Sequence, residues 1–122
     1  MILGIDVSTS ITGFAIVDDK GKIILSEACD TRKHKNFFFK GLAIKAKILD
    51  IVEAYGEKID HIYIEQPFTF FSSGGSSGKT MAALQRFNGV VSWMAYECFE
   101  IEPRYVGATQ ARILVGIKVP RG

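Results

Sequence analysis

The apolar segment Ile2–Val7 at the start of the chain narrows the choice of folds, because it carries a single charged residue, Asp6. A β-rich run with so few polar residues is typical of a strand in the middle of a sheet, covered on both faces. Alternation along the strand places Asp6 on the same face as Ile2 and Gly4. A buried carboxylate is costly unless its pKa shifts or it binds a cation, so Asp6 needs a partner.

The next two segments predict a hairpin. Thr12–Val17 and Lys22–Ala28 are rich in β-branched and other apolar residues, and the turn sequence Asp18–Gly21 separates them. Together with the first segment they predict three antiparallel strands.

A β-α-β crossover is predicted after the hairpin. Apolar residues at helical spacing predict a helix from Asn36 to Tyr55 with a stop at Gly56, and the strand Asp60–Glu65 follows. Such a crossover makes the new strand parallel to its neighbour in the sheet. The rest of the chain predicts a helix over 80–99, a strand over 101–106 and a short helix over 108–115. We therefore expect one α/β domain over residues 1–122, with a mixed sheet flanked by helices.

The helix over 80–99 is apolar nearly all round after Phe87. One face is expected to cover the sheet. The other face, with Phe87, Val91, Trp93 and Met94 as candidates, either contacts a second subunit or belongs to the same core, and the pattern favours neither.

Composition excludes several classes of protein. The chain has 122 residues, about one domain, and no apolar run long enough to span a membrane. Its start lacks the features of a secretory signal, so we expect a cytoplasmic protein, with a bacterial, phage or viral source compatible. Cys29 and Cys98 lack metal-ligand spacing and are expected to be free thiols.

Positive charge is concentrated in the second half. Residues 79–122 hold six Lys/Arg against three Asp/Glu, whereas residues 1–78 hold nine against ten. The run Arg32–Lys35 adds a local basic cluster, which by itself indicates a solvated loop.

Two strand-borne acids form the candidate site. Glu65 ends the strand before Pro67 as Asp6 ends the first strand, and two carboxylates close together require a divalent cation, a shared proton or a basic group between them. Two divalent ions at such a site activate water and stabilise the leaving oxygen of a phosphodiester. Asp6 and Glu65 are therefore predicted to be metal ligands and catalytic residues of a nuclease.

The segment Ser73–Thr80 looks like a phosphate-binding P-loop but fails the motif. A P-loop requires Gly five residues before the Gly of Gly-Lys-Thr, and that position is Ser73. A loop that starts a helix with a useful cation, Lys79, is the better interpretation.

Several segments in the same order carry a family resemblance across essentially the whole chain. They are Gly4-Ile5-Asp6, Ser8-Thr9-Ser10, Thr12-Gly13-Phe14-Ala15, Ile64-Glu65-Gln66-Pro67-Phe68, Gln110-Ala111-Arg112 and Val115-Gly116-Ile117-Lys118. Together they resemble the RuvC-type Holliday-junction resolvases of the RNase H-like superfamily. The resemblance implies a dimeric endonuclease that cuts branched DNA with Mg²⁺, or Mn²⁺ in its place, with Asp6 and Glu65 matching two of the metal-binding carboxylates. The dimer is expected to form through the helix around 80–99.

The chain departs from the family pattern at two places. Val7-Ser8 replaces the Pro-Gly that often follows the first Asp, and no acid follows Glu102, whereas the family's remaining ligands lie on a helix near the C-terminus. We therefore expect a nuclease domain that lacks its C-terminal helix.

The resemblance also implies a DNA-binding set. Phe68 lies where the family has an aromatic side chain that wedges against bases at the junction centre, and stacking of this kind contributes about 1–3 kcal/mol per base. Phosphate contacts are expected from Lys79, Arg86, Arg112 and Lys118.

Three other functions are compatible with the sequence. The start of the chain also resembles the phosphate-binding start of actin-like and sugar-kinase ATP-binding lobes. A noncatalytic module that binds branched DNA fits the missing acids, and a nuclease acting on structured RNA fits the basic groups.

Overall fold

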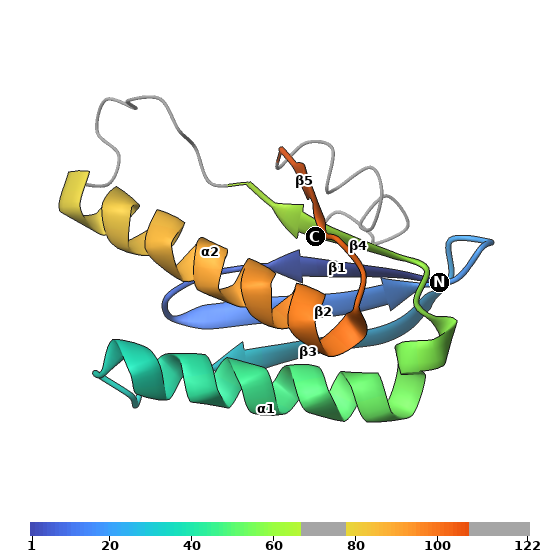
Figure 1. Ribbon diagram of the computed structural model, residues 1–122, viewed down its shortest axis with the longest axis horizontal. Helices are drawn as coiled ribbons and strands as arrows, with labels where there is room; N and C mark the ends of the chain where they lie inside the picture. The colour runs from blue at the N-terminus through green and yellow to red at the C-terminus, as the bar shows by residue number, and fades with distance from the viewer. Residues whose placement is uncertain (67–77, 108–122) are drawn as a thin grey trace.

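The computed structural model describes residues 1–66 and 78–107. Five strands form one sheet in the order β3-β2-β1-β4-β5. The central strand β1 pairs antiparallel with β2 and parallel with β4, and β2 pairs antiparallel with β3 (Figure 1). The strands are β1 (Ile2–Asp6), β2 (Ile11–Val17), β3 (Ile23–Asp30), β4 (His61–Glu65) and β5 (Arg104–Val106). The predicted mixed sheet of three antiparallel strands followed by parallel ones is confirmed.

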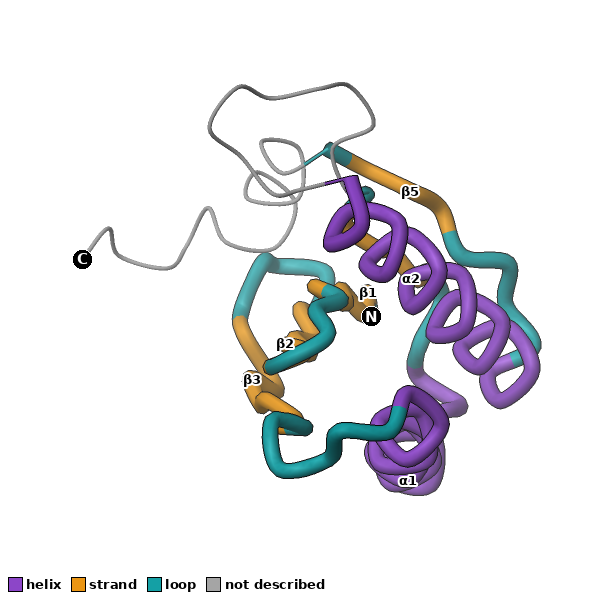
Figure 2. Tube along the Cα trace, turned by 90° about the vertical axis from the view of Figure 1, so that its left-hand side faces the viewer, coloured by secondary structure: helices purple, strands orange, loops and turns teal. Residues whose placement is uncertain are grey.

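Two helices, α1 (Phe37–Tyr55) and α2 (Gly78–Phe99), pack side by side on one face of the sheet (Figure 2). The core lies between them and the face of β1 that carries Leu3 and Ile5. The apolar sequence of β1 predicts a strand covered on both faces. Within residues 1–66 and 78–107, however, no helix lies over the face that carries Ile2, Gly4 and Asp6. This face is therefore the one on which the described helices leave room for a ligand.

Strand and helix ends differ from the predictions by a few residues. β3 continues beyond Ala28 to Asp30, because Asp30 pairs with Ile11 at the start of β2. The last strand is shorter than 101–106. Gly56 follows the end of α1 as predicted, but its φ of −51° is right-handed and it begins a short 3₁₀ turn, η1 (Gly56–Lys58).

The structure answers the question of which α2 residues face the core. Phe87 and Val91 have no exposed surface, and the ring centroids of Phe87 and Phe37 on α1 lie 5.4 Å apart. Trp93 lies on the opposite side of the helix and is 61% exposed. Assigning all four candidates to one surface is therefore wrong: Phe87 and Val91 belong to the core, half-buried Met94 packs against it, and Trp93 lies on the outer face.

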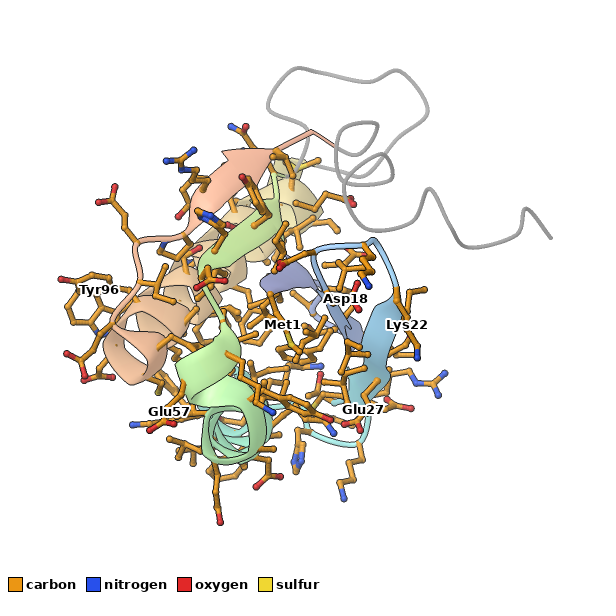
Figure 3. All side chains as sticks on the ribbon, turned by 90° about the vertical axis from the view of Figure 1, so that its right-hand side faces the viewer. Met1, Asp18, Lys22, Glu27, Glu57 and Tyr96 are labelled. Atoms are coloured by element: carbon orange, nitrogen blue, oxygen red, sulfur yellow. The ribbon has the colours of Figure 1, made fainter. Side chains whose placement is uncertain are left out.

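The β2–β3 hairpin closes the opposite end of the sheet from Asp6. Oδ1 of Asp18 accepts hydrogen bonds from the backbone N–H groups of Lys20 and Lys22, each at 2.9 Å. Gly21 has a φ of 81°, a conformation that glycine adopts at little cost. Figure 3 shows Asp18, Lys22 and the N-terminus of the chain at this end.

Membrane insertion through a helix finds no support in the described part of the chain. Neither α1 nor α2 is both long and apolar enough to cross a bilayer.

Candidate metal centre

The two predicted carboxylates lie on neighbouring parallel strands. Ile5 of β1 pairs with Ile64 of β4, so continuing this register by one residue brings Asp6 opposite Glu65. Both side chains point to the face away from the helices, because Leu3, Ile5, Ile62 and Ile64 alternate with them and are buried in the core. Neighbouring strands are about 4.8 Å apart. The pairing predicted from the strand ends is therefore compatible with one shared cation.

Asp6 lies in a setting that disfavours its charge. Burial raises the pKa of its carboxyl group above the ordinary value of 3.8. On the β2 side its neighbour is Gly13, where an added Cβ would lie 3.9 Å from the Cβ of Asp6. Glycine at this position keeps side-chain atoms off that flank of the carboxylate. The carboxylate predicted to be buried is nevertheless exposed, because Asp6 is the last residue of β1, and it is therefore accessible to a cation. A bound cation would favour the ionised form of the carboxyl group.

The loop that follows Asp6 is closed by its own hydroxyl groups. The hydroxyl of buried Thr12 donates to the carbonyl oxygen of Ser8 at 3.0 Å and accepts from the Ser8 N–H at 3.2 Å. The Ser8 hydroxyl accepts from the N–H of Ser10 at 3.1 Å. These bonds fix the backbone just beyond β1 and so restrict the position of Asp6.

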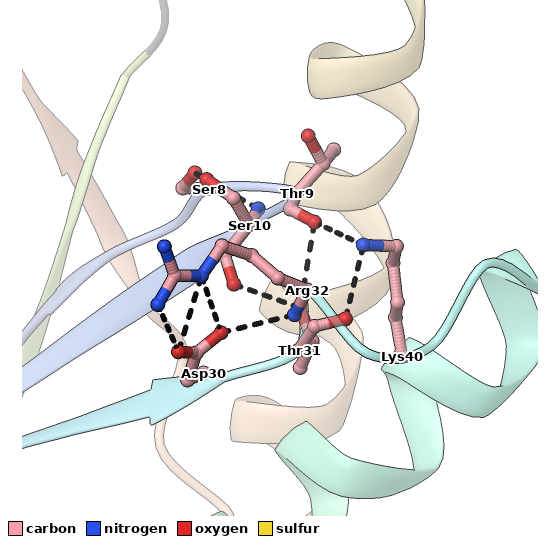
Figure 4. Close-up of polar contacts among 7 residues, drawn as sticks. All are labelled: Ser8, Thr9, Ser10, Asp30, Thr31, Arg32 and Lys40. Atoms are coloured by element: carbon pink, nitrogen blue, oxygen red, sulfur yellow. Dashed lines mark hydrogen bonds and ion pairs between the residues drawn. The ribbon is translucent and has the colours of Figure 1, made fainter.

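A second network ties this loop to the start of α1 (Figure 4). The N–H of fully buried Thr31 donates to the carbonyl oxygen of Ser10 at 2.8 Å. The ammonium group of Lys40 donates to the carbonyl oxygens of Thr9 at 2.5 Å and Thr31 at 3.2 Å. No pattern in the sequence identifies Thr31 and Lys40, because their partners are backbone atoms distant in the sequence.

A third contact holds the end of β4. Nδ2 of Asn88, a buried residue on α2, donates to the backbone carbonyl oxygen of Glu65 at 3.1 Å. The hydroxyl of Ser92 donates in turn to the carbonyl oxygen of Asn88 at 2.7 Å. A polar residue at a core position of an otherwise apolar helix was the signal for this contact in the sequence.

The structure describes some of the predicted DNA-binding residues and not others. Lys79 lies exposed in the first turn of α2, at the same end of the sheet as Asp6 and Glu65. Arg86 is exposed two turns further along α2, on its outer face. Phe68, Arg112 and Lys118 lie outside the described residues, as does the predicted helix over 108–115.

The donor set suits magnesium. Mg²⁺ is usually held by one or two carboxylates together with water and substrate phosphates. Asp6 and Glu65 supply two such carboxylates, and no group of three or more His, Cys, Asp or Glu residues that could hold a metal is found in residues 1–66 and 78–107. The chemistry of these two carboxylates is compatible with Mg²⁺. Cys29 and Cys98 are free thiols, as predicted.

The sheet order β3-β2-β1-β4-β5, with three antiparallel strands followed by parallel ones, defines the RNase H-like fold. Two solved structures share it with this chain. One is Thermus thermophilus RuvC in complex with a Holliday junction substrate, with a TM-score of 0.72, 16% identity, and coverage of 99% of this chain and 82% of RuvC. The other is a Thermus thermophilus RuvC structure, with a TM-score of 0.62, 17% identity, and coverage of 99% and 84%. Neither a protein-family model nor a curated protein matches the chain. The predicted resemblance to RuvC is confirmed at the level of the fold.

Proposed function

We propose that this protein is a structure-specific endonuclease that resolves four-way or other branched DNA junctions by metal-dependent hydrolysis of phosphodiesters. One observation carries the proposal: Asp6 and Glu65 end adjacent parallel strands of an RNase H-like sheet and point to the face that the described helices leave open. The structural neighbour in complex with a Holliday junction supports branched DNA as the substrate class.

In this proposal Asp6 and Glu65 hold Mg²⁺, for which Mn²⁺ is a substitute. The bound ion would lower the pKa of a water molecule and neutralise charge on the phosphate. Asp6 is the central ligand, because the hydrogen-bonded loop after β1 fixes its backbone. Glu65 is its partner, with its backbone carbonyl held by Asn88. In this proposal the hydrogen bonds of the protein contribute to catalysis mainly by holding the two metal-binding carboxylates in position.

The cations around the site bind phosphate in this proposal. The position of Lys79 in the first turn of α2, at the end of the sheet where the carboxylates lie, supports this role (Figure 1). Arg112 and Lys118 are proposed to contribute further phosphate contacts, and Phe68 to stack on a base at the branch point. Arg86 is given no phosphate contact in this proposal, because it lies on the outer face of α2 that is proposed below as the dimer interface. Phosphate contacts of this kind position the substrate without reading its sequence.

A substrate panel tests the function. The protein is incubated with a labelled four-way junction, a linear duplex of the same sequence, and a structured RNA, each in Mg²⁺, in Mn²⁺ and in EDTA. We expect cleavage of the junction in either metal, slower or absent cleavage of the linear duplex, and none in EDTA.

The other outcomes separate the competing functions. Tight junction binding without cleavage in either metal selects a noncatalytic DNA-binding module. Preferential cleavage of the RNA selects a ribonuclease, and thermal stabilisation by ATP with no effect of branched DNA selects an ATP-binding lobe. Any of these three results would overturn the proposed function.

We further propose that the protein is a homodimer through the outer face of α2. Ala82, Gly89, Trp93 and Tyr96 share that face, and the rings of Trp93 and Tyr96 lie 5.7 Å apart. A Cβ added at Gly89 would meet nothing within 4 Å, so no neighbour within residues 1–66 and 78–107 explains a glycine in the middle of this helix. A second helix approaching closely at Gly89 would explain it. Two copies related by a two-fold axis would present two sites to a junction.

Replacing Trp93 by Glu is expected to weaken the dimer. Buried aromatic residues at interfaces typically contribute about 2 kcal/mol or more, so the dissociation constant should rise about 30-fold. Sedimentation velocity over a concentration series measures the change. Leu49→Glu is the matched control, because Leu49 is an exposed apolar residue on the other helix, α1. Equal sedimentation of Trp93→Glu and wild type would place the interface elsewhere.

A further inference from the structure

The connection between β3 and α1, residues 31–36, is a basic loop whose charge the proposed site does not use. From residue 28 to residue 49 the chain has one acid, Asp30, against six basic residues: Arg32, Lys33, Lys35, Lys40, Lys45 and Lys47. Asp30 is bound to the guanidinium of Arg32, at 2.6 Å between Oδ2 and Nη2. Lys33 and Lys35 are exposed, and neither side chain forms an ion pair or hydrogen bond within the described residues. The loop therefore carries positive charge that nothing in this part of the chain neutralises.

The basic loop is held in place at both ends. At its start, Thr31 is bonded to Ser10 and to Lys40, as described above (Figure 4). At its end, Oδ1 of Asn36 accepts from the N–H groups of Phe38 at 2.8 Å and Phe39 at 3.1 Å and so caps α1. A loop that is already ordered loses little conformational entropy when it binds a ligand.

The basic loop and the carboxylates lie at the same end of the sheet. Asp6 pairs with Gly13 on β2, and Gly13 pairs with Ala28 on β3, so the row from Asp6 to β3 spans two strand spacings, or about 10 Å. Figure 2 shows the loop and the start of α2 at this end, on either side of β1. Lys79 and the basic loop both lie at the end of the sheet where the carboxylates are, on the side of the helices, so a strand of nucleic acid that leaves the open face around this end would meet them.

Two exposed aromatic side chains follow the basic loop directly. Phe38 is 74% exposed and Phe39 is 57% exposed, in the first turn of α1. Lysine is depleted at protein–protein interfaces, whereas cations combined with exposed aromatic rings are typical of surfaces that bind single-stranded nucleic acid. The lysines would contact phosphates and the rings would stack on unpaired bases. The charge and the aromatic rings together favour a polynucleotide over a protein partner.

We propose that Lys33, Lys35, Phe38 and Phe39 form a binding surface for a single-stranded segment of the nucleic acid that enters the candidate metal centre. The inference deepens the proposed function on which it rests: the preferred substrate is a branched DNA with unpaired nucleotides next to the branch, such as a flap or a gapped junction. A fully paired junction would use the phosphate contacts alone.

Fluorescence anisotropy tests the surface in an Asp6→Asn background, which prevents cleavage during the measurement. The probes are a single-stranded oligonucleotide, a fully paired junction and the same junction with one single-stranded arm. For Lys33→Ala/Lys35→Ala we expect the slope of log affinity against log salt on the single strand to decrease by about 1.4, because each phosphate contact contributes about 0.7. For Phe38→Ala/Phe39→Ala we expect affinity for the two probes with unpaired bases to fall about 30-fold or more, with little change for the fully paired junction.

The matched control is Lys20→Ala/Lys22→Ala. It removes the same charge from the hairpin at the opposite end of the sheet, where Figure 3 labels Lys22. If the two lysine-pair variants lose the same affinity for the single strand, only the net charge of the protein matters and the proposed binding surface is wrong. If Phe38→Ala/Phe39→Ala changes the oligomeric state but binds nucleic acid as the wild type does, the two rings belong to a protein interface. The proposed binding surface is then wrong as well.

Failure of this inference differs from failure of the proposed function. If the wild-type protein cuts no substrate but the lysine and phenylalanine pairs lose single-strand affinity, the surface stands and the nuclease proposal fails. If the protein cuts junctions and both pairs bind all probes as the wild type does, the surface alone is wrong.

Discussion

Replacing Asp6 by Asn is expected to abolish cleavage of a four-way junction while leaving junction binding in place. The change removes a metal-binding oxygen anion but keeps the size of the side chain. Charge stabilisation by a catalytic metal amounts to several kcal/mol, and each 1.36 kcal/mol is a factor of ten, so the rate should fall by about 10²- to 10³-fold or more. Single-turnover cleavage in saturating Mg²⁺ measures the rate, and anisotropy in EDTA measures binding.

Asp6→Asn also has an expected effect on stability that does not depend on activity. Because burial raises the pKa of Asp6 in the folded state, its ionised form destabilises the fold at neutral pH. The Asn variant should therefore melt at the same or a higher temperature than wild type at pH 7. This difference should disappear as the pH falls below the ordinary value of 3.8, where Asp6 is protonated in both states. Mg²⁺ should raise the melting temperature of the wild type and not of the variant.

The control for both measurements is Asp19→Asn. Asp19 is an exposed carboxylate in the hairpin turn, at the opposite end of the sheet from Asp6. The Asp19→Asn variant should cleave the junction at the wild-type rate, and Mg²⁺ should raise its melting temperature as it does for the wild type. Normal cleavage by Asp6→Asn would remove Asp6 from the reaction, and equal Mg²⁺ stabilisation of wild type and Asp6→Asn would remove it from the metal site.

The architecture could be predicted from the sequence because each step depends on local pattern. A nearly continuous apolar run identified β1, a β-rich segment before Pro67 identified β4, and the Asp18–Gly21 turn identified the hairpin. The helix between β1 and β4 predicted a parallel strand, as the structure has it. From parallel neighbours with acids at their ends, the approach of Asp6 and Glu65 follows by register alone. The amino-acid pattern is therefore sufficient to predict that these two carboxylates lie close together.

The supporting contacts could not be predicted in the same way. Lys40 binds carbonyl oxygens of Thr9 and Thr31, and Asn88 binds the carbonyl oxygen of Glu65. Every residue has a backbone carbonyl, so a sequence pattern does not identify which one a side chain will reach. These contacts depend on how α1 and α2 lie on the sheet, which is a property of the packed core.

The face of α2 that packs against the sheet could not be predicted from the sequence either. A helix that is apolar nearly all round has no polar face to mark the solvent side. Small and polar residues gave a partial signal: Asn88 and Ser92 face inward and are bonded, whereas Gly89 faces outward. Without the sheet in place, Phe87 and Trp93 were equally good candidates for either surface.

Replacing Phe87 by Ala is the largest stability change that we expect from one core residue. Phe87 is fully buried, belongs to the core cluster and packs edge-on against Phe37, with 75° between the ring planes. Truncation of a buried Phe costs about 3–5 kcal/mol, a large part of the roughly 5–15 kcal/mol that stabilises a domain. The melting temperature should fall by about 10–20 °C. Equilibrium unfolding in urea, followed by circular dichroism, measures the free energy of unfolding.

Phe38→Ala is the matched control, because it makes the same substitution one residue along α1 from the partner ring, Phe37, at a side chain that is 74% exposed. A surface truncation of this kind changes the free energy of unfolding by about 0.5 kcal/mol or less. The contrast depends on α2 placing Phe87, and not Trp93, against the sheet. If Phe87→Ala instead produced a monomer of normal stability, Phe87 would lie at a subunit interface and the orientation of α2 would be wrong. If Phe87 packs between α1 and the sheet, Phe87→Ala should lower the free energy of unfolding and leave the oligomeric state at low denaturant unchanged.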